Sequence, residues 1–225
     1  MVAVVVHGPP WFFMLDAFLA FLGMAAAVLI VLLSVKALRL TSERKFLYFA
    51  VSFILIGFAL LVRSITNVLV FLVIPYIDSI MSFGISHYRG TFFFVGYGLF
   101  IVSSIIGYVL LAVSTMRLRE PRITILLTVL VLLMLGLSSS YFLAFYLTTI
   151  ILLGFITFHV CRNCLERKSK GAFLVFFSFL LQFVAHISFV LEMVHPLFYY
   201  FGSIALLGGY GVLLVALFRV LVVKR

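Results

Sequence analysis

Residues 41–45 read Thr-Ser-Glu-Arg-Lys and separate two long apolar stretches of the chain. The stretch before them, residues 12–35, contains one charged residue, Asp16, and the stretch after them, residues 46–62, contains none. As helices rising 1.5 Å per residue, both stretches are about long enough to cross a hydrocarbon core of roughly 30 Å. We therefore expect the short charged segment to lie on one side of a bilayer, between two antiparallel transmembrane helices.

The composition of the whole chain supports this interpretation. Of its 225 residues, 66% are hydrophobic and only 10% are charged, whereas about a quarter of the residues are charged in a typical soluble domain. The apolar runs are too long and too uniform for the alternating strands of an outer-membrane barrel. The sequence therefore predicts an all-α integral membrane protein that forms one domain over residues 1–225.

Seven apolar segments are predicted to be transmembrane helices. The fourth is short for a full crossing, and it forms a hairpin with the fifth, because one continuous helix through both would be roughly 57 Å long. Residues 77–90, with Asp78, His87 and Arg89, form the longest predicted outer loop. The predicted helices cover residues 12–35, 46–75, 92–115, 123–137, 141–160, 172–191 and 198–223.

The positions of the basic residues in the sequence explain why the chain carries a net charge of +10. Fourteen of the 16 basic residues fall on every second connection, which is the positive-inside pattern of cell-membrane proteins. This pattern predicts an extracytoplasmic N-terminus, a cytoplasmic C-terminus and no nucleic-acid partner. The basic groups are Lys36, Arg39, Arg44 and Lys45; Arg117, Arg119 and Arg122; Arg162, Arg167, Lys168 and Lys170; and Arg219, Lys224 and Arg225.

Short sequence matches indicate an internal repeat. Phe-Leu-Ala-Phe at 18–21 recurs at 142–145, and Ser-Phe-Ile-Leu at 52–55 corresponds to Ser-Phe-Leu-Leu at 178–181. Gly107-Tyr108 corresponds to Gly209-Tyr210 at an offset of 102 residues. We therefore predict two three-helix units in the same orientation, residues 12–115 and 141–223, joined by a linker helix at residues 123–137.

This arrangement resembles that of the small sugar transporters, which are also built as 3+1+3. The resemblance is architectural only, because the proline–glutamine pair of that family is absent from this sequence. It implies parallel repeats with a substrate site between the two halves, near the middle of the membrane.

Two charged residues within the predicted spans are expected to pair. Asp16 lies 20 residues from Lys36, and Arg63 lies 18 residues from Lys45, so both stand roughly 27–30 Å from the cytoplasmic corner on adjacent helices. Glu192 belongs to the same layer, with His195 just beyond it. The group is either an ion pair that orients helices or an outer vestibule for a small polar or ionic ligand.

A second polar group lies deeper in the predicted bundle. Gln182 and His186 are four residues apart and share one face of the sixth span. Asn67 lies nearer the outer end of the second span. These side chains either form hydrogen bonds between helices or line a pathway.

Several functional classes find little support. Cys161 and Cys164 have no second cysteine pair with which to complete a tetrahedral metal site, and Lys224 lies beyond the last span, where it cannot hold retinal. A metal-dependent intramembrane enzyme would require His186, Glu192, His195 and Asp16 to converge, so we expect neither an enzyme nor a metal or other cofactor.

Three functions remain open. The favoured hypothesis is a small-solute transporter or permease-like protein, with candidate ligand or pathway residues Asp16, Arg63, Asn67, Gln182, His186, Glu192 and His195. The second is a receptor-like sensor that signals through a separate partner. The third is a structural subunit of a larger membrane complex, because 27 phenylalanines leave much apolar surface for lipid, for another copy or for other proteins.

Overall fold

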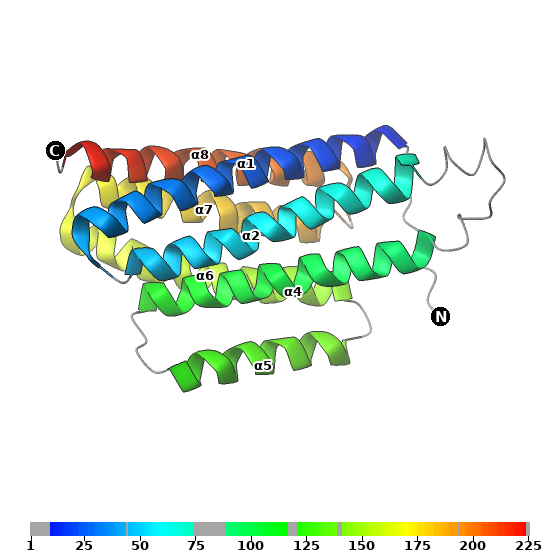
Figure 1. The fold of residues 1–225 in the computed structure, drawn as a ribbon, viewed down its shortest axis with the longest axis horizontal. Helices are drawn as coiled ribbons and strands as arrows, with labels where there is room; N and C mark the ends of the chain where they lie inside the picture. The colour runs from blue at the N-terminus through cyan, green and yellow to red at the C-terminus, as the bar shows by residue number, and fades with distance from the viewer. Residues whose placement is uncertain are drawn as a thin grey trace.

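The computed structural model describes residues 10–43, 45–73, 89–116, 121–138, 141–192 and 194–223, and these form long antiparallel helices (Figure 1). The predicted loop at 77–90 lies, apart from its last two residues, outside this set. The helices are α1 (Pro10–Thr41), α2 (Lys45–Val68) with its π-helical continuation η1 (Leu69–Val73), α4 (Arg89–Met116), α5 (Pro121–Leu137), α6 (Tyr141–Arg167), α7 (Lys170–Leu191) and α8 (Leu197–Val223).

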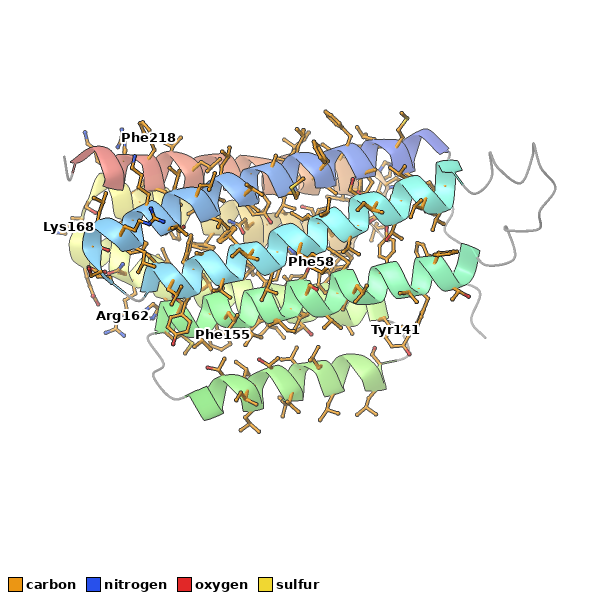
Figure 2. All side chains as sticks on the ribbon, in the orientation of Figure 1. Phe58, Tyr141, Phe155, Arg162, Lys168 and Phe218 are labelled. Carbon is orange, nitrogen blue, oxygen red and sulfur yellow. The ribbon has the colours of Figure 1, made fainter. Side chains whose placement is uncertain are left out.

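Six of these helices are long and apolar enough to cross a membrane, while α5 is shorter, at 17 residues. Phenylalanines cover the outside of the bundle, and Phe58, Phe155 and Phe218 are each about half exposed or more (Figure 2). Such side chains suit a surface in contact with lipid tails. The predicted all-α, multi-pass membrane architecture is therefore confirmed.

The six long helices contact one another in a closed ring. α2 packs between α1 and α4, and α7 packs between α6 and α8. The ring closes where α1 meets α8 and where α4 meets α6, and α5 lies at the edge against α4 and α6 (Figure 1). Its centre is filled by apolar side chains with exposures of 2% or less, namely Phe53, Ile56, Ile105, Leu153 and Ile156.

Two tight corners turn the chain at the basic end of the bundle. Ser42 and Lys168 adopt left-handed backbone angles, with φ of 54° and 48°. The Lys168 amide donates to the Cys164 carbonyl oxygen (2.9 Å), and the Ser169 hydroxyl accepts from the Ala172 amide (3.2 Å), so that Ser169 caps α7. These corners bring the ends of α1 and α2, and of α6 and α7, together on the left of Figure 1.

Candidate functional site

A buried polar network joins four helices near the end of the bundle opposite the basic corners. Arg63 on α2 donates from Nε to Asp16 Oδ2 (3.0 Å) and from Nη2 to Asp16 Oδ1 (2.9 Å). The two residues are only 8% and 5% exposed. The ion pair predicted from helix register is therefore present, in a bidentate geometry.

The remaining acceptor positions of the carboxylate are also used. Asn67 Nδ2 donates to Asp16 Oδ2, and the Tyr199 hydroxyl on α8 donates to Oδ1. Arg63 Nη2 also donates to the Tyr199 hydroxyl (3.1 Å), and the Tyr97 hydroxyl on α4 donates to Asn67 Oδ1 (2.9 Å). We call these five residues the Asp16 network. Four helices contribute to it, and the carboxylate accepts four hydrogen bonds.

The surroundings of the Asp16 network explain why it is so fully bonded. A charge within a membrane bundle is costly unless it is paired and hydrogen-bonded. The Arg63 guanidinium also lies 5.2 Å from the centre of the Phe100 ring, an attractive cation–π arrangement. The two charges of the site are therefore neutralised by each other and by hydrogen bonds, and the site is buried rather than an exposed binding pocket.

A cavity of about 20 Å³ lies beside the Asp16 network. It is bordered by Asp16, Arg63, Tyr199 and Ser203 and by apolar side chains of α1, α2, α7 and α8. This volume is enough for one water molecule, which needs roughly 10–15 Å³ and two or more polar partners. The described residues therefore leave room for about one water molecule beside the Asp16 network.

A second polar cluster lies on α7, toward the middle of the bundle. His186 is 4% exposed, and its Nδ1 lies 2.8 Å from the Gln182 carbonyl oxygen, which makes Nδ1 the protonated nitrogen because a carbonyl only accepts. The Tyr108 hydroxyl is 3.5 Å from His186 Nε2. Gln182 Nε2 donates to the Ser178 hydroxyl (3.3 Å), while Gln182 Oε1 is buried with no hydrogen-bond partner among the described residues.

The other predicted residues occupy less central positions. Glu192 is partly buried at the C-terminal end of α7. His195 is exposed and accepts a hydrogen bond from the Leu197 amide (3.2 Å) at the start of α8, so it stands outside the Asp16 network. Cys161 and Cys164 are free thiols, and within the described residues no three His, Cys, Asp or Glu side chains converge on a common point.

Sequence reasoning missed the tyrosines. Tyr97 and Tyr199 complete the Asp16 network, and Tyr108 contacts His186. A signal for them was present, because Tyr97 and Tyr199 are separated by the same 102 residues as Gly107 and Gly209.

Gly107 and Gly209 are two of four glycines among the described residues that allow unusually close helix contacts. A Cβ on Gly107 would lie 2.8 Å from Ile56 Cγ1 and 3.0 Å from the Ser52 carbonyl oxygen. A Cβ on Gly209 would lie 2.9 Å from Gln182 Cγ and 3.0 Å from the Ser178 carbonyl oxygen. Each pair of helices, α2 with α4 and α7 with α8, therefore meets closely around a glycine and a serine.

No protein-family model, curated protein or solved structure matches this chain.

Glu192 provides a prediction about pH. Burial raises the pKa of its carboxyl, Arg63 opposes the shift and Asp16 adds to it. A raised folded-state pKa stabilises the protein below the ordinary value of about 4.3, and this contribution is lost as the pH rises through the raised pKa. Glu192→Gln should therefore raise Tm at neutral pH and flatten the decline of Tm with pH. Thermal unfolding from about pH 4 upward tests this, and an unchanged slope in the variant would contradict it.

Proposed function

We propose that the protein is a small-solute transporter in which two three-helix units move against each other. The first unit is α1, α2 and α4, the second is α6, α7 and α8, and α5 is the linker between them. In this proposal the solute passes between the units, and the described conformation is closed.

The packing supports two equivalent units. The contacts of Gly107 with Ser52 and Ile56 correspond to those of Gly209 with Ser178 and Gln182, at distances that differ by 0.1 Å or less. The arrangement of helices within each unit is also the same, since the second helix packs between the first and the third. Both ring closures, α1 with α8 and α4 with α6, then join one unit to the other.

The observation that carries the proposal is the path of the Asp16 network across the interface between the units. Asp16 and Arg63 belong to the first unit, and Tyr199, which bonds to both, belongs to the second. We infer that this contact is a gate. Breaking the Tyr199 contacts would separate α1 from α8 at this end, while the Asp16–Arg63 pair stays intact within its own unit.

Gln182 and His186 are the proposed solute contacts beyond the gate. Gln182 Oε1 is a buried acceptor without a partner among the described residues, and such a group is available to a ligand that donates a hydrogen bond. His186 lies at the interface between the units, because it contacts Tyr108 on α4 of the first unit, so separation of the units is expected to expose it and the neighbouring turn of α7.

The orientation is part of the same proposal. The helix ends that carry Lys36, Arg39, Arg162, Lys170 and Arg219 gather at one end of the bundle. The positive-inside rule then places that end in the cytoplasm and the Asp16 network near the outer surface, with the N-terminus outside and the C-terminus inside.

Flux into proteoliposomes tests the proposal. The purified protein is reconstituted, proton flux is followed with entrapped pyranine, and entry of small sugars, amino acids and organic acids is followed by liposome swelling. We expect flux above that of protein-free liposomes for at least one solute, reduced about tenfold or more by Gln182→Leu and by His186→Leu. Leu126→Ala, on the exposed face of α5, is the matched control and should keep full flux.

Absence of flux for all solutes and protons would contradict transport, and unchanged flux in both α7 variants would remove those residues from the path.

The gate has a separate readout. In a Cys161→Ser/Cys164→Ser background, Ser203→Cys beside the cavity should react several-fold faster with a membrane-impermeant thiol reagent when Tyr199→Phe is added. Equal reaction rates would contradict the gate.

A receptor-like function is the second candidate, and the packing of the centre favours it. Phe53, Ile56 and Ile105 are each 2% exposed or less, and the cavity at the Asp16 network has a volume of only about 20 Å³. A receptor would bind a ligand and change shape without flux, so solute-dependent thermal stabilisation in the absence of transport would support this function instead.

A further inference from the structure

A second, larger cavity lies at the basic end of the bundle, far from the Asp16 network along the helices. Its volume is about 450 Å³, and it is open to the surroundings. The corner between α6 and α7 forms one side of it, and the last turns of α8 form another. Its lining residues are Cys164, Lys168, Ser169, Lys170, Phe173, Leu174 and Arg219.

The charge of this cavity is entirely positive. Lys168, Lys170 and Arg219 line it, no acidic residue does, and none of the three forms an ion pair with another described residue. By contrast, Arg162, one turn before Glu166 on α6, is paired with it (3.1 Å). Three unpaired cations on one concave surface attract a group that carries negative charge on several oxygens, such as a phosphate.

The backbone that carries the two lysines is fixed by local hydrogen bonds. Lys168 occupies a left-handed conformation with its amide bonded to Cys164, and Ser169 caps α7, so the corner between the two helices has little freedom. Lys168 and Lys170 flank this corner, and Arg219 approaches from α8. The backbone positions from which these side chains extend are therefore arranged before any ligand arrives, which lowers part of the entropic penalty of binding.

The remaining wall is apolar and continues toward the membrane. Phe173 is 55% exposed, and it stacks on Phe177 one turn further along α7, which is 40% exposed. Leu174 adds a half-buried apolar surface beside them. A free phosphate would not use this surface, whereas the acyl chains of a phospholipid would lie along it with the headgroup among the cations.

We infer that this cavity is a binding site for the phosphate headgroup of an anionic glycerophospholipid, with the acyl chains along Phe173 and Phe177. The site is independent of the proposed transport activity. It requires only that the helices lie in a membrane with the basic corners at its surface.

Native mass spectrometry of the detergent-purified protein tests this inference, with phosphatidylglycerol and phosphatidylcholine of matched acyl chains as probes. Wild type should retain phosphatidylglycerol in preference to phosphatidylcholine. Lys168→Gly/Arg219→Gln should weaken phosphatidylglycerol binding roughly 25-fold, since each basic residue near a membrane surface contributes about a fivefold preference for anionic lipid. Lys36→Gln/Arg39→Gln removes two charges from the same end of the bundle and should change binding less than threefold.

The same experiment includes a control for loss of folding in the variants. Glycine suits the left-handed backbone of Lys168, so Tm of the Lys168→Gly variant should be unchanged or higher while lipid binding falls. If the double variant is not monodisperse, Arg219→Gln alone is compared with Arg39→Gln alone.

Three outcomes would overturn the inference. Equal losses in the two charge-removal variants would indicate diffuse attraction to a basic surface. Equal retention of the two lipids by wild type would exclude headgroup recognition. Displacement of phosphatidylglycerol by excess glycerol phosphate would assign the cavity to a free phosphate compound rather than a lipid.

Discussion

Asp16→Asn is expected to destabilise the folded bundle by about 3–5 kcal/mol, the largest effect predicted for a single residue in this protein. Asparagine has nearly the same shape as aspartate, so packing is conserved and the loss is electrostatic. Arg63, which is only 8% exposed, would keep its charge within the bundle without its counterion. The measurement is the free energy of unfolding in mixed detergent–SDS micelles.

The exposed pair Arg162–Glu166 provides a matched control. Its atoms are 3.1 Å apart, against 2.9 Å in the Asp16–Arg63 pair, but its side chains are 74% and 62% exposed rather than 10% and 7%. Glu166→Gln should therefore change stability by no more than about 0.5 kcal/mol. Equal effects of Asp16→Asn and Glu166→Gln would show that burial of the Asp16–Arg63 pair does not govern its contribution to stability.

A double variant separates pairing from burial. Asp16→Asn/Arg63→Gln removes both charges, so no buried charge is left uncompensated, and the loss should be clearly smaller than the sum of the two single losses. Additive losses would contradict the assignment of the destabilisation to an unpaired buried charge.

Gly209→Ala is expected to destabilise the protein by about 1–3 kcal/mol, because the new methyl group cannot be accommodated without moving α7 away from α8. Its Cβ would meet the Ser178 carbonyl oxygen at 3.0 Å, and a backbone atom cannot rotate away as a side chain can. The Ser178 hydroxyl also donates to the Gly209 carbonyl oxygen (2.9 Å), and this bond lengthens if the helices separate. Gly107→Ala should have a similar effect through the Ser52 carbonyl oxygen.

Gly211→Ala, two residues further along α8, is the control for the loss of glycine itself. Apart from its own helix backbone, no described residue has a heavy atom within 4 Å of its Cβ position, so alanine should leave stability unchanged or raise it by up to about 1 kcal/mol through helix propensity. The same unfolding assay serves all three variants. A Gly209→Ala protein as stable as Gly211→Ala would show that α7 and α8 do not meet as closely as described.

Much of the fold follows from local sequence. Span length, the absence of charge within spans and the basic corner at 41–45 predicted the helices, and most predicted ends agree with the structure to within a few residues. The main differences are the extensions of α1 to Thr41 and of α6 to Arg167. Both lie at basic ends, where a helix continues past its apolar stretch because its own backbone hydrogen bonds do not depend on the membrane.

The Asp16–Arg63 pair was also predictable, because the constant helical rise converts residue number into depth and only one acidic and one basic residue stand at that depth on the first two helices. Tyr199 and Tyr97 were not predicted as members of the network. A tyrosine at a membrane helix end is common as an interfacial anchor, and residue counting along one helix gives no information about its rotation toward a neighbour.

By itself, the sequence determined the class of protein, the helices and the depth of each buried charge, since these depend on hydrophobicity and a fixed rise per residue. Tertiary structure alone decided which helices are neighbours, how the Asp16 carboxylate satisfies its acceptors, that His195 stands outside the network, and that Lys168, Lys170 and Arg219 line one cavity. These properties depend on the rotation and contact of helices distant in the chain, which side-chain packing fixes and hydropathy does not.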